Sequence, residues 1–425
     1  MITNWFRQVF KNAFIPFILF SAGVGVSAFI SCSNTPDNSP QAKEYCVYEE
    51  ECIKGPYTRC PGGGFLSDKC PFEDSGDGAS SSSVEVVVSS SSVGGAVNCS
   101  GPVSCYGKLQ ASGNKLVGLK TGTAVQVRGV SLFWSNTGWG GDRFFNAATV
   151  NAMVDDWKAE IIRVPIGYSE NGGYMSDPSN LTRVKTAINA AIAKDVYVII
   201  DWHSHNAHNE TAAAIAFFTE MAQTYGSNDH VIFEIYNEPL DVTTWATIKN
   251  YAASIISAIR QHSSNLILVG TPSWDQNVDV VAATGAKIND PNVAYVFHFY
   301  AASHTVTFYQ SKINSVLSAG LPVFVSEYGT THYDGGNPDE GNYNTHNATN
   351  ANAWHTYMDN NKISSCAWSV NDKYEGSAFF GVNRTGFTQS AANFSNTSMM
   401  TPSGQYIFNK LRTYANSALW RGGSN

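Results

Sequence analysis

The sequence predicts an α/β fold, a (β/α)8 TIM barrel, in which eight parallel strands close into a ring and a helix follows each strand. Three observations predict it. Short apolar runs typical of buried strands recur from residue 124 to residue 370. Their centres are 28 to 42 residues apart, which leaves room for one helix in each interval. Polar side chains stand where the runs end, and that end of such a barrel carries the active site.

The eight predicted strands are centred at Arg128, Arg163, Ile199, Glu234, Leu268, Val296, Val325 and Ala367. Between them, residues 180–194 and 245–261 carry apolar side chains at helical spacing, which predicts two of the helices. Upstream, residues 106–119 alternate around a Ser-Gly-Asn turn and read as a hairpin. We expect this hairpin to close the bottom of the barrel.

Two of the runs end in a glutamate. Residues 231–239 read VIFEIYNEP, so Glu238 follows a buried strand that Pro239 stops, because proline has no N–H to donate. Residues 321–329 read LPVFVSEYG and are apolar until Glu327. A carboxylate at the end of a buried strand is costly unless it is needed. The two glutamates therefore suggest one site.

The N-terminus predicts export. Arg7 and Lys11 precede an uncharged stretch, residues 13–31, as in a secretory signal. This stretch is longer than a typical signal core, so an uncleaved membrane anchor is the competing interpretation. The segment FISC, ending at Cys32, resembles a bacterial lipobox, so lipidation of Cys32 and simple cleavage both stay open. We expect a secreted or cell-surface protein, with an outer-membrane lipoprotein as one form of it.

Cysteine spacing suggests a small module after the signal. Cysteines cluster within 25 residues, at Cys46, Cys52, Cys60 and Cys70. They predict two disulfides with three possible pairings, and a zinc knuckle is the weaker alternative because close C-x-x-C pairs are missing. Cys99 and Cys105 can close a short loop, and Cys366 reads as a small buried hydrophobe.

The expected domains are therefore a signal or lipoprotein-type segment at 1–31, a Cys-rich module at 32–73, a Ser/Gly/Val-rich linker at 74–97 and the barrel catalytic domain at 98–425. The module carries aromatic residues that can face a sugar chain, at Tyr45, Tyr48, Tyr57, Phe65 and Phe72. The alternative is a disulfide-stapled spacer, which we favour slightly because the module has no Trp.

Composition limits the partners. A net charge of −8, 14% charged residues and the lack of a basic run argue against nucleic acid and against an anionic membrane surface. Aromatic residues make up 12% of the chain, with ten Trp and twenty Tyr. In an exported barrel, this favours stacking on sugar rings. We expect a monomer.

Read together, the strand ends form one constellation. In chain order they carry Arg163, His203, Asn237, Glu238, Trp274, His298, Tyr300, Glu327 and Trp368. A lone strand-end histidine is more often structural than catalytic, and a lone arginine is more often a salt-bridge partner. Such residues on seven successive units, all at one end of the barrel, are hard to explain by packing alone.

The constellation resembles glycoside hydrolase family 5, in the clan of retaining glycosidases on (β/α)8 barrels. The resemblance covers about residues 106–415 and is carried by the segments RGVSLFWSNTGWGG, RVPIGY, DWHSH, FEIYNEP, HFYAASH, VSEYG and WSVNDKYEGSA, which are similar to those of bacterial endoglucanases. NEP alone is a weak signal. NEP followed by E-Y-G, with the Arg, His and His-x-Tyr elements in order, is specific.

The resemblance implies a role for each matching residue. Glu238 corresponds to the general acid/base and Glu327 to the nucleophile. Residues that hold the nucleophile ionised and bind the sugar 2-hydroxyl are Arg163, Asn237 and Tyr300, and His203 and His298 line the same subsite. Further sugar contacts are implied for Tyr168, Trp274, Trp368, Lys373, Glu375, His304 and Trp139. Where many relatives have a histidine after the first strand, this chain has Phe133.

The implied activity is endo-acting hydrolysis of β-1,4-glucosidic bonds in cellulose or related β-glucans by a retaining double displacement, which requires no metal or cofactor. A β-mannanase or a xyloglucanase can use the same pair of glutamates. A non-catalytic polysaccharide-binding surface protein is the alternative from another class. A metal site at His203, His205 and His208 is the weakest interpretation, because no matching carboxylates accompany them.

Overall fold

The computed structural model describes residues 43–47, 52–57, 65–67, 99–381 and 387–415. Its contacts divide the chain into two units, Met1–Ser92 and Val93–Asn425. In the first unit, β1 (Lys43–Val47) pairs antiparallel with β2 (Cys52–Tyr57) and with β3 (Phe65–Ser67). The predicted signal, Cys32, the linker and the side chains of the clustered cysteines and aromatics lie outside the described residues.

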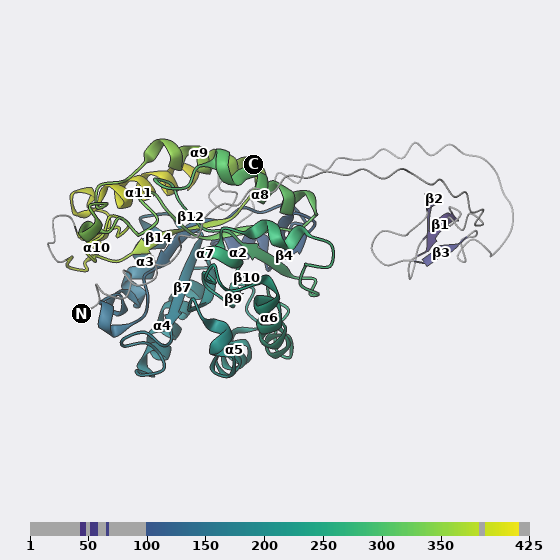
Figure 1. The fold of residues 1–425 in the computed structure, drawn as a ribbon, viewed down its shortest axis with the longest axis horizontal. Helices are drawn as coiled ribbons and strands as arrows, with labels where there is room; N and C mark the ends of the chain where they lie inside the picture. Colours follow the sequence, from purple (N-terminus) through teal and green to yellow (C-terminus); the bar gives the residue numbers. More distant parts are fainter. Residues whose placement is uncertain (1–42, 48–51, 58–64, 68–98, 382–386, 416–425) are drawn as a thin grey trace, which may run out of the picture. The chain divides into compact units, whose positions relative to one another are not determined.

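The second unit contains the closed parallel barrel that the sequence predicts (Figure 1). Its strands are β6 (Arg128–Leu132), β7 (Ile161–Gly167), β8 (Tyr197–His203), β9 (Val231–Glu234), β10 (Ile267–Val269), β11 (Val293–Val296), β13 (Val323–Gly329) and β14 (Ser365–Val370). Pairing of β14 with β6 and of β11 with β13 closes the ring. The two-residue β12 (Phe299–Tyr300) extends it beside β13. Each predicted centre falls within one of the eight strands, so the fold prediction is confirmed.

Helices lie around the outside of the barrel (Figure 1). The long ones are α3 (Ala147–Asp155), α4 (Ser179–Ala193), α5 (Thr211–Tyr225), α6 (Trp245–Arg260), α8 (Val306–Ser318), α9 (Ala348–Asn361) and α11 (Pro402–Ala415). The two helices predicted from periodicity are α4 and α6, displaced by one residue at most. Between β10 and β11 the described chain has only the short α7 (Pro272–Asp275) and a 3-10 turn (Val278–Ala282). The 28-residue spacing there is close to the 29 residues between the centres of β11 and β13, which contain α8, so spacing does not explain why this described interval has no long helix.

Helix α6 shows how the sequence specifies these elements. Thr244 caps its N-terminus, because the Thr244 side chain accepts a hydrogen bond from the backbone N–H of Thr247. Ile248, Ile255 and Ile259 lie on one face and are buried against the barrel. Among the described residues, no helix is both long and apolar enough to cross a bilayer.

The hairpin closes the bottom of the barrel as predicted. Strands β4 (Leu109–Ser112) and β5 (Lys115–Gly118) pair antiparallel. Leu109 and Leu116 are buried in one cluster with Ile161 and Tyr197, which begin β7 and β8. The amino ends of the strands are thereby sealed, so the open end of the barrel is the carboxyl end.

Two cysteine predictions fall on described residues. Cys99 and Cys105 are joined by a disulfide with a Cα–Cα distance of 5.3 Å, just before the hairpin. Cys366 lies in β14 as a buried free thiol. It packs in the cluster at the bottom of the barrel, as expected for a small hydrophobe.

Candidate active site

Strand β13 delivers Glu327 to the open end of the barrel. All seven residues of this strand are buried, and Glu327 is 4% exposed. The strand ends at Gly329, where a Cβ atom would lie 2.3 Å from the ring of Tyr300. Glycine is therefore needed here so that Tyr300 can lie against the strand. In that position the Tyr300 hydroxyl donates to Oε1 of Glu327 at 2.7 Å.

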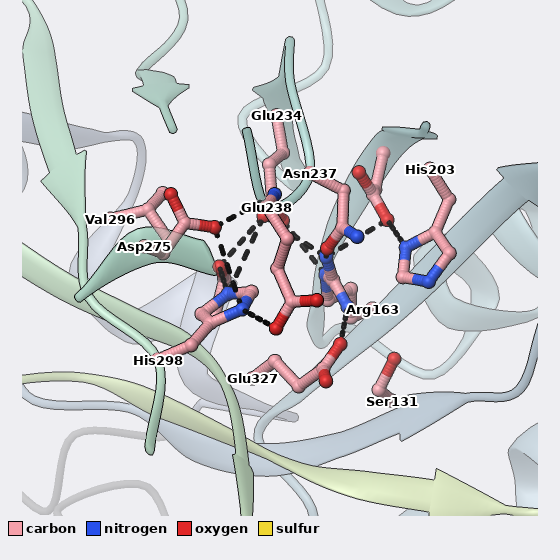
Figure 2. Close-up of polar contacts among 12 residues, drawn as sticks. Ser131, Arg163, His203, Glu234, Asn237, Glu238, Asp275, Val296, His298 and Glu327 are labelled. Carbon is pink, nitrogen blue, oxygen red and sulfur yellow. Dashed lines mark hydrogen bonds and ion pairs between the residues drawn. The ribbon is translucent and has the colours of Figure 1, made fainter. Parts of the chain in front are cut away.

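Arg163, on β7, organises the centre of the site (Figure 2). Its guanidinium is completely buried. It donates to both carboxylate oxygens of Glu234, at 2.8 and 3.0 Å, and to Oε2 of Glu327 at 2.8 Å. It also donates to Oδ1 of Asn237 at 2.7 Å and lies 3.0 Å from Oδ2 of Asp201. A buried cation is tolerated because these partners satisfy it.

The surroundings of Glu327 act on its charge in opposite directions. Burial raises the pKa of Glu327 to about 7, while Arg163 and the Tyr300 hydroxyl oppose that rise. The two donors favour the ionised form, as the sequence predicts. Burial outweighs them in the free protein, which the sequence did not indicate.

Glu238 follows β9 in an uncommon backbone conformation, with φ at +48°. Left-handed backbone is unfavourable for a residue with a Cβ, so neighbouring contacts must hold it. Asp275 supplies one, because its Oδ2 accepts the backbone N–H of Glu238 at 2.9 Å. His298 supplies another, because its Nδ1 lies 3.1 Å from Oε1 of Glu238.

Glu238 has the stronger tendency to keep its proton. Burial raises the pKa of Glu238 well above its ordinary value, and the charges of Glu327 and Asp275 raise it further. Among the described residues, no guanidinium contacts the carboxyl of Glu238. Glu327 therefore ionises first, and Glu238 remains the acid of the pair.

The two carboxyl groups are close together. Carboxylate oxygens of Glu238 and Glu327 and a ring nitrogen of His298 all lie within 4.8 Å of one another. Inverting glycosidases keep their carboxyls roughly 6.5 to 9.5 Å apart to admit a water, whereas retaining ones keep them about 5 to 5.5 Å apart. The observed separation fits the retaining arrangement.

Asn237 and His203 stand beside this pair. The Oδ1 of Asn237 is held by Arg163, whereas its buried Nδ2 has no protein partner among the described residues. That N–H group is free to donate to a ligand hydroxyl. His203 is 2% exposed, and its Nδ1 lies 2.6 Å from Oδ2 of Asp201. Asp201 therefore fixes the ring of His203 in the site.

Aromatic side chains from β14 and from the segment after β6 line the next part of the site. The ring of Trp368 stacks on His203 with a centroid distance of 5.2 Å and packs on Phe133 at 5.4 Å. Trp139 packs edge-on against Trp134 at 4.9 Å. The cluster also includes Tyr300, so it reaches the hydroxyl that contacts Glu327.

Phe133, the one departure from the expected family pattern, makes a definite contact. The ammonium group of Lys373 lies 5.1 Å from the centroid of the Phe133 ring. The same ammonium group pairs with Oε2 of Glu375 at 2.9 Å. Lys373 and Glu375 therefore lie together beside the aromatic cluster.

The remaining predicted residues lie farther from the carboxyl pair. Trp274 is 39% exposed and follows β10, and its backbone N–H donates to the carbonyl of Pro239 beside Glu238. The ring of Tyr168 packs on Trp202 and Tyr174.

His304 contacts the backbone of Tyr300. Its Nδ1 accepts the backbone N–H of Tyr300 at 3.0 Å, and burial lowers the pKa of His304 to about 4. This contact orients Tyr300. That His304 also contacts a sugar stays a prediction.

The sequence interpretation did not place five residues in the site, and it considered His205 only as a metal ligand. The five are Trp134, Asp201, Glu234, Asp275 and Ser326. Glu234 and Asp201 are charged residues inside otherwise apolar strands, so that anomaly could have identified them. Asp275 and Ser326 carry no comparable signal. Their importance depends on backbone and ring contacts that form only in the fold.

The described residues offer one cluster with metal-ligand geometry, formed by Glu238, His298 and Glu327. Glu238 already contacts His298, and Glu327 already receives hydrogen bonds from Arg163 and Tyr300, so we assign no metal to them. The three histidines weighed in the sequence do not converge on one point. His205 contacts the carbonyl of Glu238, and His208 contacts the Tyr236 hydroxyl.

Comparison with known proteins places these observations in a family. The sequence model described as Cellulase (glycosyl hydrolase family 5) matches residues 119–374. Endoglucanase Z of Dickeya dadantii is 45% identical over 284 residues, which are 66% of this chain and 64% of that protein. Endoglucanase N of Pectobacterium atrosepticum is 36% identical over 323 residues, 74% of this chain and 68% of that protein. The chain thus spans less than two thirds of the length of Endoglucanase Z.

Solved structures agree with the sequence matches. The catalytic domain of Thermobifida fusca endoglucanase Cel5A superimposes with a TM-score of 0.64 at 32% identity, covering 73% of this chain and 99% of that one. A variant of the same domain in complex with cellotetraose gives a TM-score of 0.63 with the same identity and coverage.

Proposed function

The chain belongs to glycosyl hydrolase family 5, and on that premise we propose that it cleaves internal β-1,4-glucosidic bonds of cellulose or related β-glucans with retention of configuration. The observation that carries the proposal is the pair Glu238 and Glu327, with carboxylate oxygens within 4.8 Å and only Glu327 bound to a guanidinium. Proteins named endoglucanases share this barrel, and one of them is solved with cellotetraose.

In the first step, ionised Glu327 attacks the anomeric carbon while Glu238 gives its proton to the leaving oxygen. Arg163 and Tyr300 hold the attacking carboxylate in place by contacts to its two oxygens. The free Nδ2 of Asn237 donates to the sugar 2-hydroxyl, a contact that strengthens in the transition state.

In the second step, the roles of the carboxyl groups change. Once Glu327 is an ester, its negative charge is gone, so the pKa of Glu238 falls and its carboxylate can take a proton from water. Water then cleaves the ester and restores both groups. The cycle uses only side chains of this protein.

The aromatic surfaces suggest where the sugar chain lies. Trp368, stacked on His203, is positioned to hold the sugar whose bond is cleaved. Lys373 and Glu375 would bind the next sugar on the non-reducing side. Trp274 would bind the leaving group, because it is half-exposed and its backbone touches the loop of Glu238.

The test is hydrolysis of carboxymethylcellulose, mannan and xyloglucan, read as reducing sugar, with NMR of the first anomer released from a cello-oligosaccharide. We expect β-glucan to be preferred and the β-anomer to appear first. Preference for mannan or xyloglucan would replace the substrate assignment, and an initial α-anomer would overturn the retaining mechanism. No reducing sugar from any of them would overturn the proposal of an enzyme.

We also propose that the protein works outside the cytoplasm. The charged start followed by an uncharged stretch supports export, and the disulfide between Cys99 and Cys105 fits an oxidising compartment. Labelling cells of the source organism with a membrane-impermeant reagent, with and without a Cys32→Ala substitution, separates a lipid-anchored protein from a released one.

A further inference from the structure

A chain of hydrogen bonds through His298 and Ser326 joins the carboxyl of Glu238 to that of Glu234. Nδ1 of His298 lies 3.1 Å from Oε1 of Glu238, and Nε2 of the same ring lies 2.9 Å from Oγ of Ser326. That Oγ lies 2.7 Å from Oε1 of Glu234. Because His298, Ser326 and Glu234 are at most 1% exposed, bulk water does not compete for these bonds.

Counting hydrogens fixes the direction of this chain at Ser326. A serine hydroxyl has one hydrogen to donate. Burial raises the pKa of Glu234 to about 7, while Arg163, bound to both oxygens, opposes that rise. The ionised carboxylate only accepts, and the Ser326 hydroxyl is placed to donate to it. Ser326 therefore donates its hydrogen to Glu234. Its Oγ is left to accept a hydrogen bond from the ring of His298.

The same count fixes the ring of His298. Burial and the charge of Arg163 lower the pKa of His298 well below its ordinary value, so the ring is neutral and carries one N–H. Because Ser326 must receive that N–H, the hydrogen is on Nε2. Nδ1 then presents a lone pair to Glu238, and their contact is a hydrogen bond only when Glu238 donates the proton.

We propose that Ser326 is a positioning residue that fixes the tautomer of His298, so that the ring accepts the proton of Glu238 and keeps this carboxyl in its acid form. The inference rests on the proposed function, in which Glu238 is the acid. Ser326 touches neither the substrate nor the reacting atoms. It acts through His298.

Other titratable and charged groups face Glu238 and His298 from the surrounding elements: Arg163 on β7, His203 and His205 at the end of β8, Glu234 on β9, Asp275 after β10, Tyr300 on β12 and Glu327 on β13. The nearest to the ring is Asp275, whose Oδ2 lies 3.5 Å from Nδ1 and already accepts the N–H of Glu238. His205 lies 3.8 Å from Oε2 of Glu238. All of these groups remain in the Ser326 variants, so they do not account for a difference between variants.

The first experiment is the pH profile of kcat/KM for Ser326→Ala on a soluble cello-oligosaccharide. Without the acceptor at Nε2, the ring can carry its hydrogen on Nδ1 and donate to ionised Glu238, which lowers the pKa of Glu238. Activity is lost as pH rises through that pKa, so the alkaline limb should move down by about one pH unit. The acid limb should stay in place. An unshifted alkaline limb would overturn the proposal.

Two further variants make the shift specific. Ser326→Thr keeps a hydroxyl and should restore the alkaline limb of the native chain. Ser403→Ala removes another buried serine hydroxyl, which accepts from Thr330 just beyond the end of β13, and should leave the limb unmoved. An equal shift in Ser403→Ala would show a general effect of losing a hydroxyl and would overturn the proposal.

A second measurement uses the native chain, so it does not depend on whether a variant folds. In the native chain labelled with ¹⁵N, the His298 resonances should show a protonated Nε2 and an unprotonated Nδ1. A ring protonated on Nδ1 contradicts the proposal whatever the variants do. This readout needs no substrate, so it separates failure here from failure of the proposed function, in which the native chain would release no sugar from β-glucan.

Discussion

The surroundings of Glu327 and of Glu238 differ, although the two side chains are chemically the same. Glu327 lies on a buried strand and receives hydrogen bonds from a guanidinium and a phenol. Glu238 lies in a loop, with His298 at its carboxyl and Asp275 at its backbone. Burial raises the pKa of both carboxyl groups, but the two donors at Glu327 oppose that rise, so Glu327 is the easier one to ionise. The difference shows that position on the barrel, rather than residue type, assigns the two roles.

Arg163 and His298, which contact the two carboxyl groups, are each held by further side chains. On the Glu327 side, Arg163 is kept in place by Glu234 and Asp201. On the Glu238 side, Ser326 connects His298 to the same Glu234. Glu234 thus supports both carboxyl groups without touching either one.

The largest effect is expected from Glu327→Ala, which removes one of the two carboxyl groups. Turnover on soluble β-glucan should fall on the order of 10⁵-fold, because no covalent intermediate can form. The fold should persist, since Glu234 and Asp201 still neutralise Arg163. Azide should restore turnover with inverted configuration, which NMR of the product can show. Native rates without azide would mean that Glu327 is not the nucleophile.

Glu238→Gln should cost about 10²- to 10⁴-fold in turnover on natural substrates, because the leaving oxygen loses its proton donor. Aryl glycosides with acidic leaving groups should be affected much less in the first step. Azide should rescue these substrates with retention, in contrast to the Glu327 variant. Rescue with inversion would exchange the roles of the two glutamates.

Tyr300→Phe removes one of the two donors to Glu327 and leaves both carboxyl groups in place. Losing the phenol donor raises the pKa of Glu327, which burial has already raised to about 7. The nucleophile must be ionised, and activity is lost as pH falls through its pKa. The acid limb of kcat/KM should therefore move up by about one pH unit, while the alkaline limb stays. Movement of the alkaline limb alone would contradict this assignment.

The smallest effect is expected from Trp274→Ala. Trp274 is on the Glu238 side and contacts neither carboxyl, so its loss should weaken binding and leave ionisation alone. We expect kcat/KM on cello-oligosaccharides to fall about tenfold. Both limbs of the pH profile should remain where they are in the native chain. A shifted limb would mean that this loop holds Glu238 in place as well as binding sugar.

The fold could be predicted because its signal repeats along the chain. Each strand is a local apolar run, and each run is separated from the next by a helix-sized interval. The weakest point of that prediction was the fifth unit, where α7 and a 3-10 turn stand in place of a long helix. Spacing alone does not say how such a gap is filled.

The positions of the site residues could be predicted for a similar reason. In a parallel barrel all strand ends meet at one rim, so Arg163, Tyr300 and Glu327 were expected to be neighbours before any distance was known. Glu234 was visible only as an interruption of an apolar run. The net rise in the pKa of Glu327 was not predicted, because the cost of burial depends on how completely the barrel excludes water.

The sequence by itself determined the barrel, its open end and the pair of glutamates, because these depend on periodicity and on order along the chain. Only the tertiary structure decided which group donates and which group accepts in each hydrogen bond of the site. The left-handed turn at Glu238, the bond from Asp275 to its backbone and the path through Ser326 arise where separate loops meet. Such contacts depend on distances of a few tenths of an ångström, and no pattern of residue types along a chain specifies them.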